Sequence, residues 1–225
     1  MSSTILSTKR LSASQRELAL NGKLNIVEYD AIKIQYIPFE IAFEFDCFIF
    51  TSQNAVKSYL KNPKSLFVEQ KKPKKLKALC VGEKTKRLLE ENDFEVLATK
   101  ENAESLGEVI LSKYKKYSFL FLSGNLRRAS IPELLKNNNI RYKEIVVYNT
   151  TLNLKTFKNK FDGILFFSPS GIESFTQFNN LSKSTAFCIG STTFNEAIKH
   201  TNRLVQANKP TIENVIVQAV KYYNS

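Results

Sequence analysis

The chain has 225 residues, of which 43% are hydrophobic, and its 33 Lys and Arg against 21 Asp and Glu give a net charge of +12. This length suits one large domain or two modest ones, each with its own core. The positive charge favours an anionic partner, for which nucleic acid, a membrane surface and a polyanionic small molecule all qualify; plain solubility is the alternative.

Cysteine and histidine usage excludes several kinds of site. Cys47, Cys80 and Cys188 lie far apart within apolar runs, so we expect buried thiols of a reducing compartment and no disulfide framework. No two cysteines have metal-ligand spacing, and His200 is the only histidine, which argues against a zinc site and a histidine-dependent triad. The N-terminal sequence lacks signal-peptide features, and no apolar run approaches the roughly 20 residues of a membrane span. A cytoplasmic protein without a metal is expected.

Apolar runs of strand length alternate with segments of helical period along the chain, which is typical of parallel sheets covered by helices. Ten strands are predicted, beginning near residues 4, 24, 46, 77, 94, 118, 142, 162, 185 and 203. Because ten strands are too many for one sheet at this length, we expect two five-stranded sheets. The lysine-rich segment 62–77 is interpreted as a solvated surface loop, in preference to a nuclear signal or a nucleic-acid patch.

Two regions of the sequence repeat one pattern. "FDCFIFTSQNAVKSY" at 45–59 returns as "FDGILFFSPSGIESF" at 161–175, an offset of 116 residues. "LCVGEKTKRLL" at 79–89 matches "FCIGSTTFNEA" at 187–197 at an offset of 108. Each copy indicates a buried strand, a polar turn and a helix, repeated along the chain.

The N-terminus completes the second copy. "TILSTKRLSASQRELALNGKL" at 4–24 matches the region 120–140, again at an offset of 116, with Ser7 aligned to Ser123. We infer a circularly permuted duplication, with chance similarity between unrelated α/β units as the alternative. The expected fold is two similar parallel-sheet α/β domains, flavodoxin-like, of which the first is discontinuous. The expected boundaries are 1–36 with 151–225 for one domain and 37–150 for the other, joined by extended crossings at 32–39 and 146–153 that form a two-stranded hinge.

The predicted strands end in polar turns. In open parallel α/β sheets, ligands bind beyond the carboxyl ends of the strands, where helix N-termini offer N–H groups to anions. Serine, threonine, glycine and basic residues gather at six such ends, with Glu83 as the only acid: 7–10, 51–52, 82–85, 123–128, 168–170 and 190–193. Any single hydroxyl could be an ordinary helix cap, and Thr193 could act mainly in that way. Together the turns predict an anion site in a cleft between the domains.

Signatures of nucleotide chemistry are missing from the sequence. No G-x-G-x-x-G follows a strand, no G-x-x-x-x-G-K-[ST] occurs, and no close carboxylate pair suggests acid–base work at the strand ends. Anion binding without a conventional catalytic constellation is the remaining interpretation.

Read in order, these motifs resemble the uroporphyrinogen-III synthase family. The matching segments cover nearly the whole chain: "FIFTSQNAV" (48–56), "CVGEKT" (80–85), "AESL" (103–106), "VVYNT" (146–150), "FFSPSGIESF" (166–175), "CIGSTT" (188–193) and "KPTIENV" (209–215). The resemblance implies a cyclising hydro-lyase of haem biosynthesis. Such an enzyme converts hydroxymethylbilane, a linear polycarboxylate tetrapyrrole, to uroporphyrinogen III with loss of water and inversion of ring D, without metal or organic cofactor.

The resemblance also implies roles for particular residues. Tyr148 aligns with the tyrosine of the family motif, and its phenol, protonated at neutral pH, is a candidate donor to the departing hydroxyl; a tyrosine that merely packs the hinge is the alternative. The substrate cyclises unaided, so the protein mainly has to hold it in the geometry of the inverted product. The expected substrate-binding residues are Lys9, Arg10, Thr51, Ser52, Thr85, Ser123, Arg127, Ser168, Ser170, Thr192 and Thr193.

The chain departs from the family pattern at a few positions. Many relatives have a lysine where this chain has Thr185, with Lys183 two residues earlier, and the usual Thr-Arg appears as Thr8-Lys9-Arg10. The assignment of each cation to a substrate carboxylate therefore stays open. We expect a monomer that binds neither nucleic acid nor membrane and makes at most transient contact with the preceding pathway enzyme.

Two other functions remain as alternatives. A non-catalytic two-domain anion-binding module would share the fold and the polar turns. A nucleic-acid binder would need basic residues interleaved with aromatic residues on one face, whereas the lysines here cluster in one loop.

Overall fold

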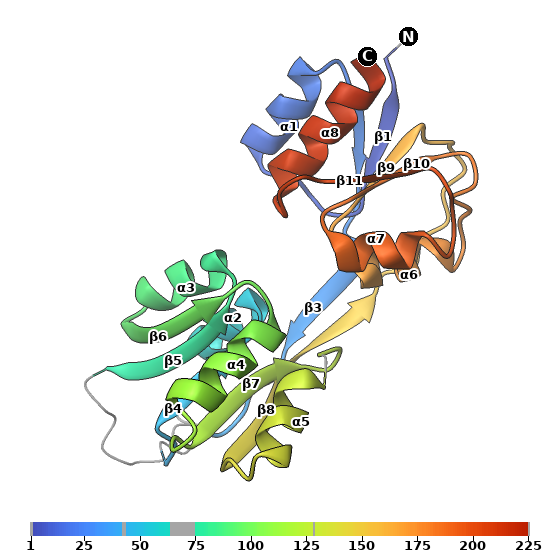
Figure 1. Cartoon of the computed structure of the whole chain (residues 1–225). Coiled ribbons are helices and arrows are strands. Elements are labelled where there is room, and N and C mark those ends of the chain that lie inside the picture. The colour runs from blue at the N-terminus through green and yellow to red at the C-terminus, as the bar shows by residue number, and fades with distance from the viewer. Residues whose placement is uncertain (1, 42–43, 64–74, 128, 225) are drawn as a thin grey trace. The chain divides into compact units, whose positions relative to one another are not determined.

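The computed structural model describes residues 2–41, 44–63, 75–127 and 129–224 (Figure 1). Arg128 and residues 64–74 of the lysine-rich segment lie outside the described residues. The chain forms two compact units: unit 1 comprises residues 1–33 and 151–225, and unit 2 comprises residues 34–150. The crossings predicted from the sequence lie after residues 36 and 150.

Unit 1 holds a five-stranded sheet in the order β11-β10-β9-β1-β2, with every neighbouring pair parallel. In the order of the chain this is 2-1-3-4-5, the flavodoxin-like arrangement. The strands are β1 Thr4–Ser7, β2 Asn25–Glu28, β9 Gly163–Phe166, β10 Thr185–Cys188 and β11 Leu204–Gln206. The parallel α/β class predicted from the sequence is confirmed.

Helices cover both faces of this sheet (Figure 1). Helices α1 Ala13–Asn21 and α8 Ile212–Asn224 pack over one core cluster, and α6 Pro169–Thr176 and α7 Ser191–Ala197 pack over the other. Neighbouring residues of a strand point to opposite faces, so Ile5 contributes to one cluster and Leu6 to the other. Burial on both faces explains why these strands are continuous apolar runs in the sequence.

Unit 2 holds a six-stranded sheet in the order β3-β8-β7-β4-β5-β6. Its strands are β3 Ile32–Tyr36, β4 Cys47–Phe50, β5 Leu76–Val81, β6 Phe94–Lys100, β7 Phe119–Gly124 and β8 Tyr142–Leu152. Helices α2 Gln53–Lys61 and α3 Glu83–Glu90 cover one core cluster, and α4 Ala103–Lys113 and α5 Ser130–Asn137 cover the other. The strands β4 to β8 are parallel to their neighbours.

All ten predicted strands are present, but the expectation of two five-stranded sheets is wrong for unit 2. The sixth strand, β3, is the first of the two crossings that were expected to be extended. It lies beside β8, whose last residues form the second crossing. A segment that leaves a domain in extended form can add to the sheet because its backbone groups need hydrogen-bond partners.

The two sheets have the same spatial order once the duplication is taken into account. The order β11-β10-β9-β1-β2 of unit 1 corresponds strand for strand to β6-β5-β4-β7-β8 of unit 2. The pairing Phe166–Cys188 in unit 1 repeats as Phe50–Cys80 in unit 2, as the offsets of 116 and 108 require. The permuted order of strands therefore agrees with a duplication.

The pairing of the N-terminal strand β1 in its sheet differs from the alignment at an offset of 116 residues, in which Ser7 matches Ser123. Ser7 lies beside Leu165, whose repeat equivalent Ile49 lies beside Phe121, so Ser7 corresponds in the sheet to Phe121 and not to Ser123. A shift of two residues leaves every side chain on the same face. The apolar pattern alone cannot distinguish the two registers.

The described cysteines are free and buried in the central strands, as predicted. Burial raises the pKa of the Cys47 and Cys188 thiols to about 12. Among the described residues no helix combines the length and apolar character needed to cross a membrane.

Candidate functional site

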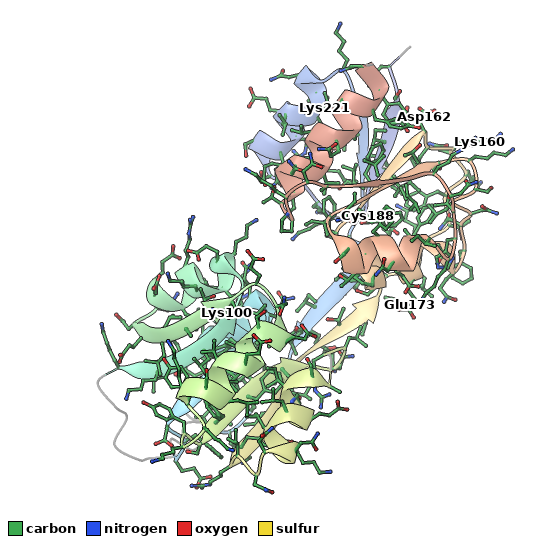
Figure 2. The ribbon with its side chains drawn as sticks, in the orientation of Figure 1. Lys100, Lys160, Asp162, Glu173, Cys188 and Lys221 are labelled. Atoms are coloured by element: carbon green, nitrogen blue, oxygen red, sulfur yellow. The ribbon has the colours of Figure 1, made fainter. Side chains whose placement is uncertain are left out.

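The polar turns of each unit meet at the carboxyl edge of its own sheet. Edge 1, in unit 1, consists of turns 8–12, 167–170 and 189–193, which follow β1, β9 and β10. Edge 2, in unit 2, consists of turns 51–52, 82–85 and 123–127, together with Tyr148. Figure 2 shows the side chains, with Cys188 labelled where β10 ends in unit 1 and Lys100 where β6 ends in unit 2.

At edge 1, Ser168 caps helix α6. Its hydroxyl oxygen accepts a hydrogen bond from the Gly171 N–H at 3.1 Å and lies 3.2 Å from the hydroxyl of Ser170. Pro169 occupies the first turn of the helix, where its missing N–H costs nothing. Ser168 is thus a true helix cap, and both hydroxyls remain half-buried at the edge.

The turn after β1 carries the cations of edge 1. Thr8 is buried and donates its hydroxyl hydrogen to the Leu165 carbonyl at 2.7 Å, which fixes the start of the turn. Lys9 and Arg10 are exposed. The Arg10 Nε lies 3.6 Å from an Asp30 oxygen, and the two side chains are 80% and 46% exposed, so this ion pair holds the guanidinium weakly.

The third turn of edge 1 begins helix α7. Its N-cap is Gly190, with no side-chain cap hydrogen bond, so Thr193 is not the cap residue. Thr193 is 1% exposed and packs inside the first turn, whereas Thr192 is exposed. The alternative in which Thr193 acts mainly as a cap is therefore wrong, and Thr192 presents the accessible hydroxyl.

At edge 2, two helices begin side by side. Ser52 caps α2 and accepts from the Asn54 N–H at 3.1 Å, and Thr51 is half-buried before it. Gly82 caps α3 with φ of +84°, a backbone conformation that favours glycine. Thr85, in the first turn of α3, is 4% exposed and therefore contributes more to packing than to an open surface.

Ser123 and Arg127 of edge 2 are both bonded to Glu144 of β8. The guanidinium contacts both carboxylate oxygens at 2.6 and 2.7 Å, and the Ser123 hydroxyl donates to one of them at 2.7 Å. Burial raises the pKa of Glu144, but the hydrogen bonds from Arg127 and Ser123 together lower it by more, so the net pKa lies below the ordinary value. Two predicted substrate-binding groups are thus paired within the protein.

Sequence reasoning missed Glu144 because it lies within strand β8, near its start, away from the polar turns. Only the pairing of β7 with β8, which sets Glu144 beside Phe121, brings its carboxylate to the arginine. Asp30 of edge 1 was missed for a different reason: it follows β2, the edge strand of the sheet, whereas the predicted polar turns follow the other strands. The sequence showed Glu83 as the only acid at the strand ends, but the structure also brings Glu144 and Asp30 to the edges.

Tyr148 lies on β8 at edge 2, beside Gly124 of β7. Burial raises the pKa of its phenol by more than the nearby Ser52 hydroxyl lowers it, so the net pKa lies above the ordinary value. The ring also packs against the core cluster that contains Val147 and Phe50. A phenol in this place stays protonated at neutral pH and can donate a proton to an oxygen at the edge.

Other sequence expectations fall away from the edges. Thr185 and Lys183 lie at the amino end of β10, opposite edge 1, and the Thr185 hydroxyl is 3.4 Å from that of Tyr222. In the part of the chain that the structure describes, no group of three or more His, Cys, Asp and Glu could hold a metal ion.

Fold and edges together define a class: a two-unit α/β protein of the duplicated, permuted kind, with hydroxyls, helix N-termini and cations at the carboxyl ends of parallel strands. The family model described as "Uroporphyrinogen-III synthase HemD" matches residues 16–216. The chain belongs to the uroporphyrinogen-III synthase family, and the resemblance inferred from the sequence is confirmed.

Individual relatives agree with this assignment. The chain is 27% identical over 215 residues to the "Porphyrin biosynthesis protein HemD" of Ruminiclostridium josui; the match takes in 84% of this chain but 42% of that protein, less than half its length. The crystal structure of uroporphyrinogen-III synthetase from Helicobacter pylori aligns with a TM-score of 0.69 at 22% identity, over 98% of this chain and 99% of that one. A mutant uroporphyrinogen III synthase from Thermus thermophilus gives a TM-score of 0.66 at 14% identity, over 98% of each chain. At these identities the structural matches establish the fold.

Proposed function

We propose that the chain is a uroporphyrinogen-III synthase, which cyclises hydroxymethylbilane to uroporphyrinogen III with loss of water and inversion of ring D. Membership of the family supports this proposal. The observation that carries it is Tyr148, a partly buried phenol on β8 that packs over Gly124 at a polar edge and whose raised pKa keeps it protonated. A substrate that readily loses water needs an acid and a template more than it needs a nucleophile.

The two edges supply groups suited to a polycarboxylate. Lys9 and Arg10 of edge 1 are exposed cations, and the N-termini of α6 and α2 offer N–H groups and a partial positive charge. The hydroxyls of Thr51, Ser170 and Thr192 add hydrogen-bond donors. We propose that these groups bind the acetate and propionate carboxylates of the substrate.

Tyr148 acts in the first chemical step of the proposed reaction. It donates its phenolic proton to the terminal hydroxyl, the C–O bond breaks, and water departs. The carbon that carried the hydroxyl then becomes an azafulvene-like electrophile. Ring D attacks this carbon through its already substituted position, and the spiro intermediate fragments and recloses in the inverted sense. When the newly bonded carbon of ring D loses its proton and the pyrrole becomes aromatic again, a proton returns to the phenolate.

A place in the cell follows from the same chemistry. The substrate cyclises unaided, so its lifetime in water favours rapid capture close to the enzyme that makes it. We propose a cytoplasmic location and a transient contact with that preceding enzyme.

The test is a coupled assay in which the purified chain receives freshly generated hydroxymethylbilane and the oxidised products are separated by isomer. Predominant type III product, in proportion to protein and without added cofactor, is the expected outcome. Type I product alone at several protein concentrations would contradict the proposal. Tight binding of the substrate without type III product would favour the non-catalytic anion-binding module.

A further inference from the structure

The ring of Tyr148 crosses one strand to reach another. The strands β8, β7 and β4 are neighbours in this order, and Tyr148 on β8 packs against the core cluster that contains Phe50 of β4. The ring therefore passes over β7 at Gly124. A Cβ atom at Gly124 would lie 2.5 Å from Cε2 and 2.7 Å from the hydroxyl oxygen of Tyr148, so any side chain there must displace the ring.

A β-bulge turns the backbone of β8 at this point. Ser123 lies beside Val146 and Gly124 lies beside Tyr148, so Val147 is an extra residue in the pairing. Without the extra residue, Val147 would face Gly124. Bulges re-aim side chains in this way and are common beside functional sites.

Hydrogen bonds from three segments hold the bulge on either side of Tyr148. The Val147 carbonyl accepts from the Ile37 N–H at 2.9 Å and from the hydroxyl of Ser58, which is 2% exposed in α2. The Asn125 N–H donates to the Tyr148 carbonyl at 3.2 Å. Beyond the tyrosine, the Asn125 side chain accepts from the Thr150 N–H at 2.7 Å and donates to the Thr150 carbonyl at 3.2 Å.

We propose that Ser58, Gly124 and Asn125 are positioning residues that hold the bulge and the Tyr148 ring so that the phenol reaches edge 2. The catalytic part of this inference rests on the proposed function; the positional part does not. Helix α2 contributes twice, since Ser52 at its N-cap lies near enough to the phenol to lower its pKa and Ser58, later in the same helix, donates to the backbone carbonyl at the bulge.

The duplication supplies a matched control. Ser174 is the repeat equivalent of Ser58, is likewise buried, and lies in α6 of unit 1. Replacing either serine by alanine removes one buried hydroxyl from corresponding helices. Only Ser58→Ala removes a contact to the bulge.

The first experiment follows Tyr148 without any substrate. Tyrosine labelled with ¹³C at the Cζ atom gives one resonance for each tyrosine, and Tyr148→Phe identifies the resonance of Tyr148. Titration of Ser58→Ala, Asn125→Ala and Gly124→Ala is expected to show the pKa of Tyr148 falling toward its ordinary value as the phenol becomes solvated, whereas Ser174→Ala leaves it unchanged. An unchanged Tyr148 pKa in folded Ser58→Ala and Asn125→Ala would overturn the proposal, even if Gly124→Ala does not fold.

The second experiment measures coupling to catalysis. Asn125→Ala is expected to lower kcat about 10- to 100-fold with KM nearly unchanged, because a small misplacement of the acid affects the chemical step. In the Tyr148→Phe background the same substitution should change kcat less than about twofold, since an acid that is absent cannot be misplaced. Equal losses in both backgrounds would overturn the positioning role. If the unmodified chain makes no type III product, the proposed function fails while the titration still decides the positional part.

Discussion

The two units place an arginine at corresponding edges and hold it in different ways. In unit 1 the Arg10 guanidinium lies 3.6 Å from Asp30, and both side chains are largely in solvent. In unit 2 the Arg127 guanidinium is bidentate to Glu144 at 2.6 and 2.7 Å, with side-chain exposures of 33% and 18%, and Ser123 completes the network. The first cation is available to an anionic ligand, and the second is largely used within the protein.

The difference shows that corresponding arginines of two similar units can have different roles: one is available for binding, and the other stabilises its unit. A bidentate pair that is partly shielded from water is strong, because the geometry fixes both hydrogen bonds and the dielectric constant is lower. A solvated pair is weak and exchanges easily for a substrate carboxylate. In the proposed function, edge 1 therefore mainly binds the substrate, whereas edge 2 combines binding hydroxyls with the proposed acid, Tyr148.

The largest effect is expected from the acid itself. Tyr148→Phe should lower kcat by about 10²- to 10⁴-fold, the range for loss of a general acid, while type III remains the isomer of any enzymatic product. Tyr29→Phe is the matched control, because Tyr29 is a buried tyrosine of unit 1 whose pKa is raised to about 12 by burial. It should leave kcat within about twofold, as it lies in the core away from the reacting groups. Unchanged kcat in Tyr148→Phe would assign the tyrosine to packing alone.

The two arginines should separate stability from affinity. Arg127→Ala is expected to destabilise the protein by about 2 kcal/mol, because Glu144 then keeps a shielded charge without its bidentate partner. Arg10→Ala should cost less than about 0.5 kcal/mol and instead raise KM for hydroxymethylbilane. Urea denaturation followed by circular dichroism gives the first quantity and the coupled assay the second. If Arg10→Ala destabilised the protein and Arg127→Ala mainly raised KM, the contrast drawn between the two arginines would be wrong.

The helix caps test whether the repeats are equivalent. Ser52→Ala and Ser168→Ala each remove a cap acceptor with a 3.1 Å hydrogen bond and should each cost about 1 kcal/mol of stability. Glycine at either position should cost only a few tenths of a kcal/mol. Of the two, only Ser52→Ala should also shift the Tyr148 resonance, since Ser52 influences the pKa of that phenol and Ser168 lies in the other unit. A shift from Ser168→Ala would show coupling that these local contacts do not account for.

The smallest effect is expected in acid. The pKa of Glu144 is lowered in the folded protein, so its ionisation stabilises the fold above the pKa of the unfolded state and this contribution is lost as the pH falls through the folded value. The urea midpoint of the unmodified protein should therefore decrease as the pH is lowered below about 4.3, the ordinary glutamate value. The urea midpoint of Glu144→Gln should depend less on pH in this range. An identical acid profile in Glu144→Gln would remove Glu144 from this role.

Much of the fold follows from the sequence because burial on both faces leaves long apolar runs, and amphipathic segments lie between them. The runs located all ten predicted strands, and the turns after them located the polar edges that contain Ser52, Ser168 and Thr192. The repeat could be recognised because matched small residues such as Ser58 and Ser174 recur at a fixed offset. These features depend on local composition and periodicity, which a sequence carries directly.

The tertiary structure decided what depends on register. A shift of two residues keeps every side chain on its face, so the true correspondence of β1 with β7 was invisible in the apolar pattern. The pairing of β7 with β8, including its bulge, brings Glu144 to Arg127 and carries Tyr148 across Gly124. Such contacts join residues about twenty positions apart, and hydrogen bonds between adjacent strands set them. The sequence by itself therefore determined which hydroxyls and cations follow the strands, and only the packed sheet determined which acids, such as Glu144, reach them and which groups are paired.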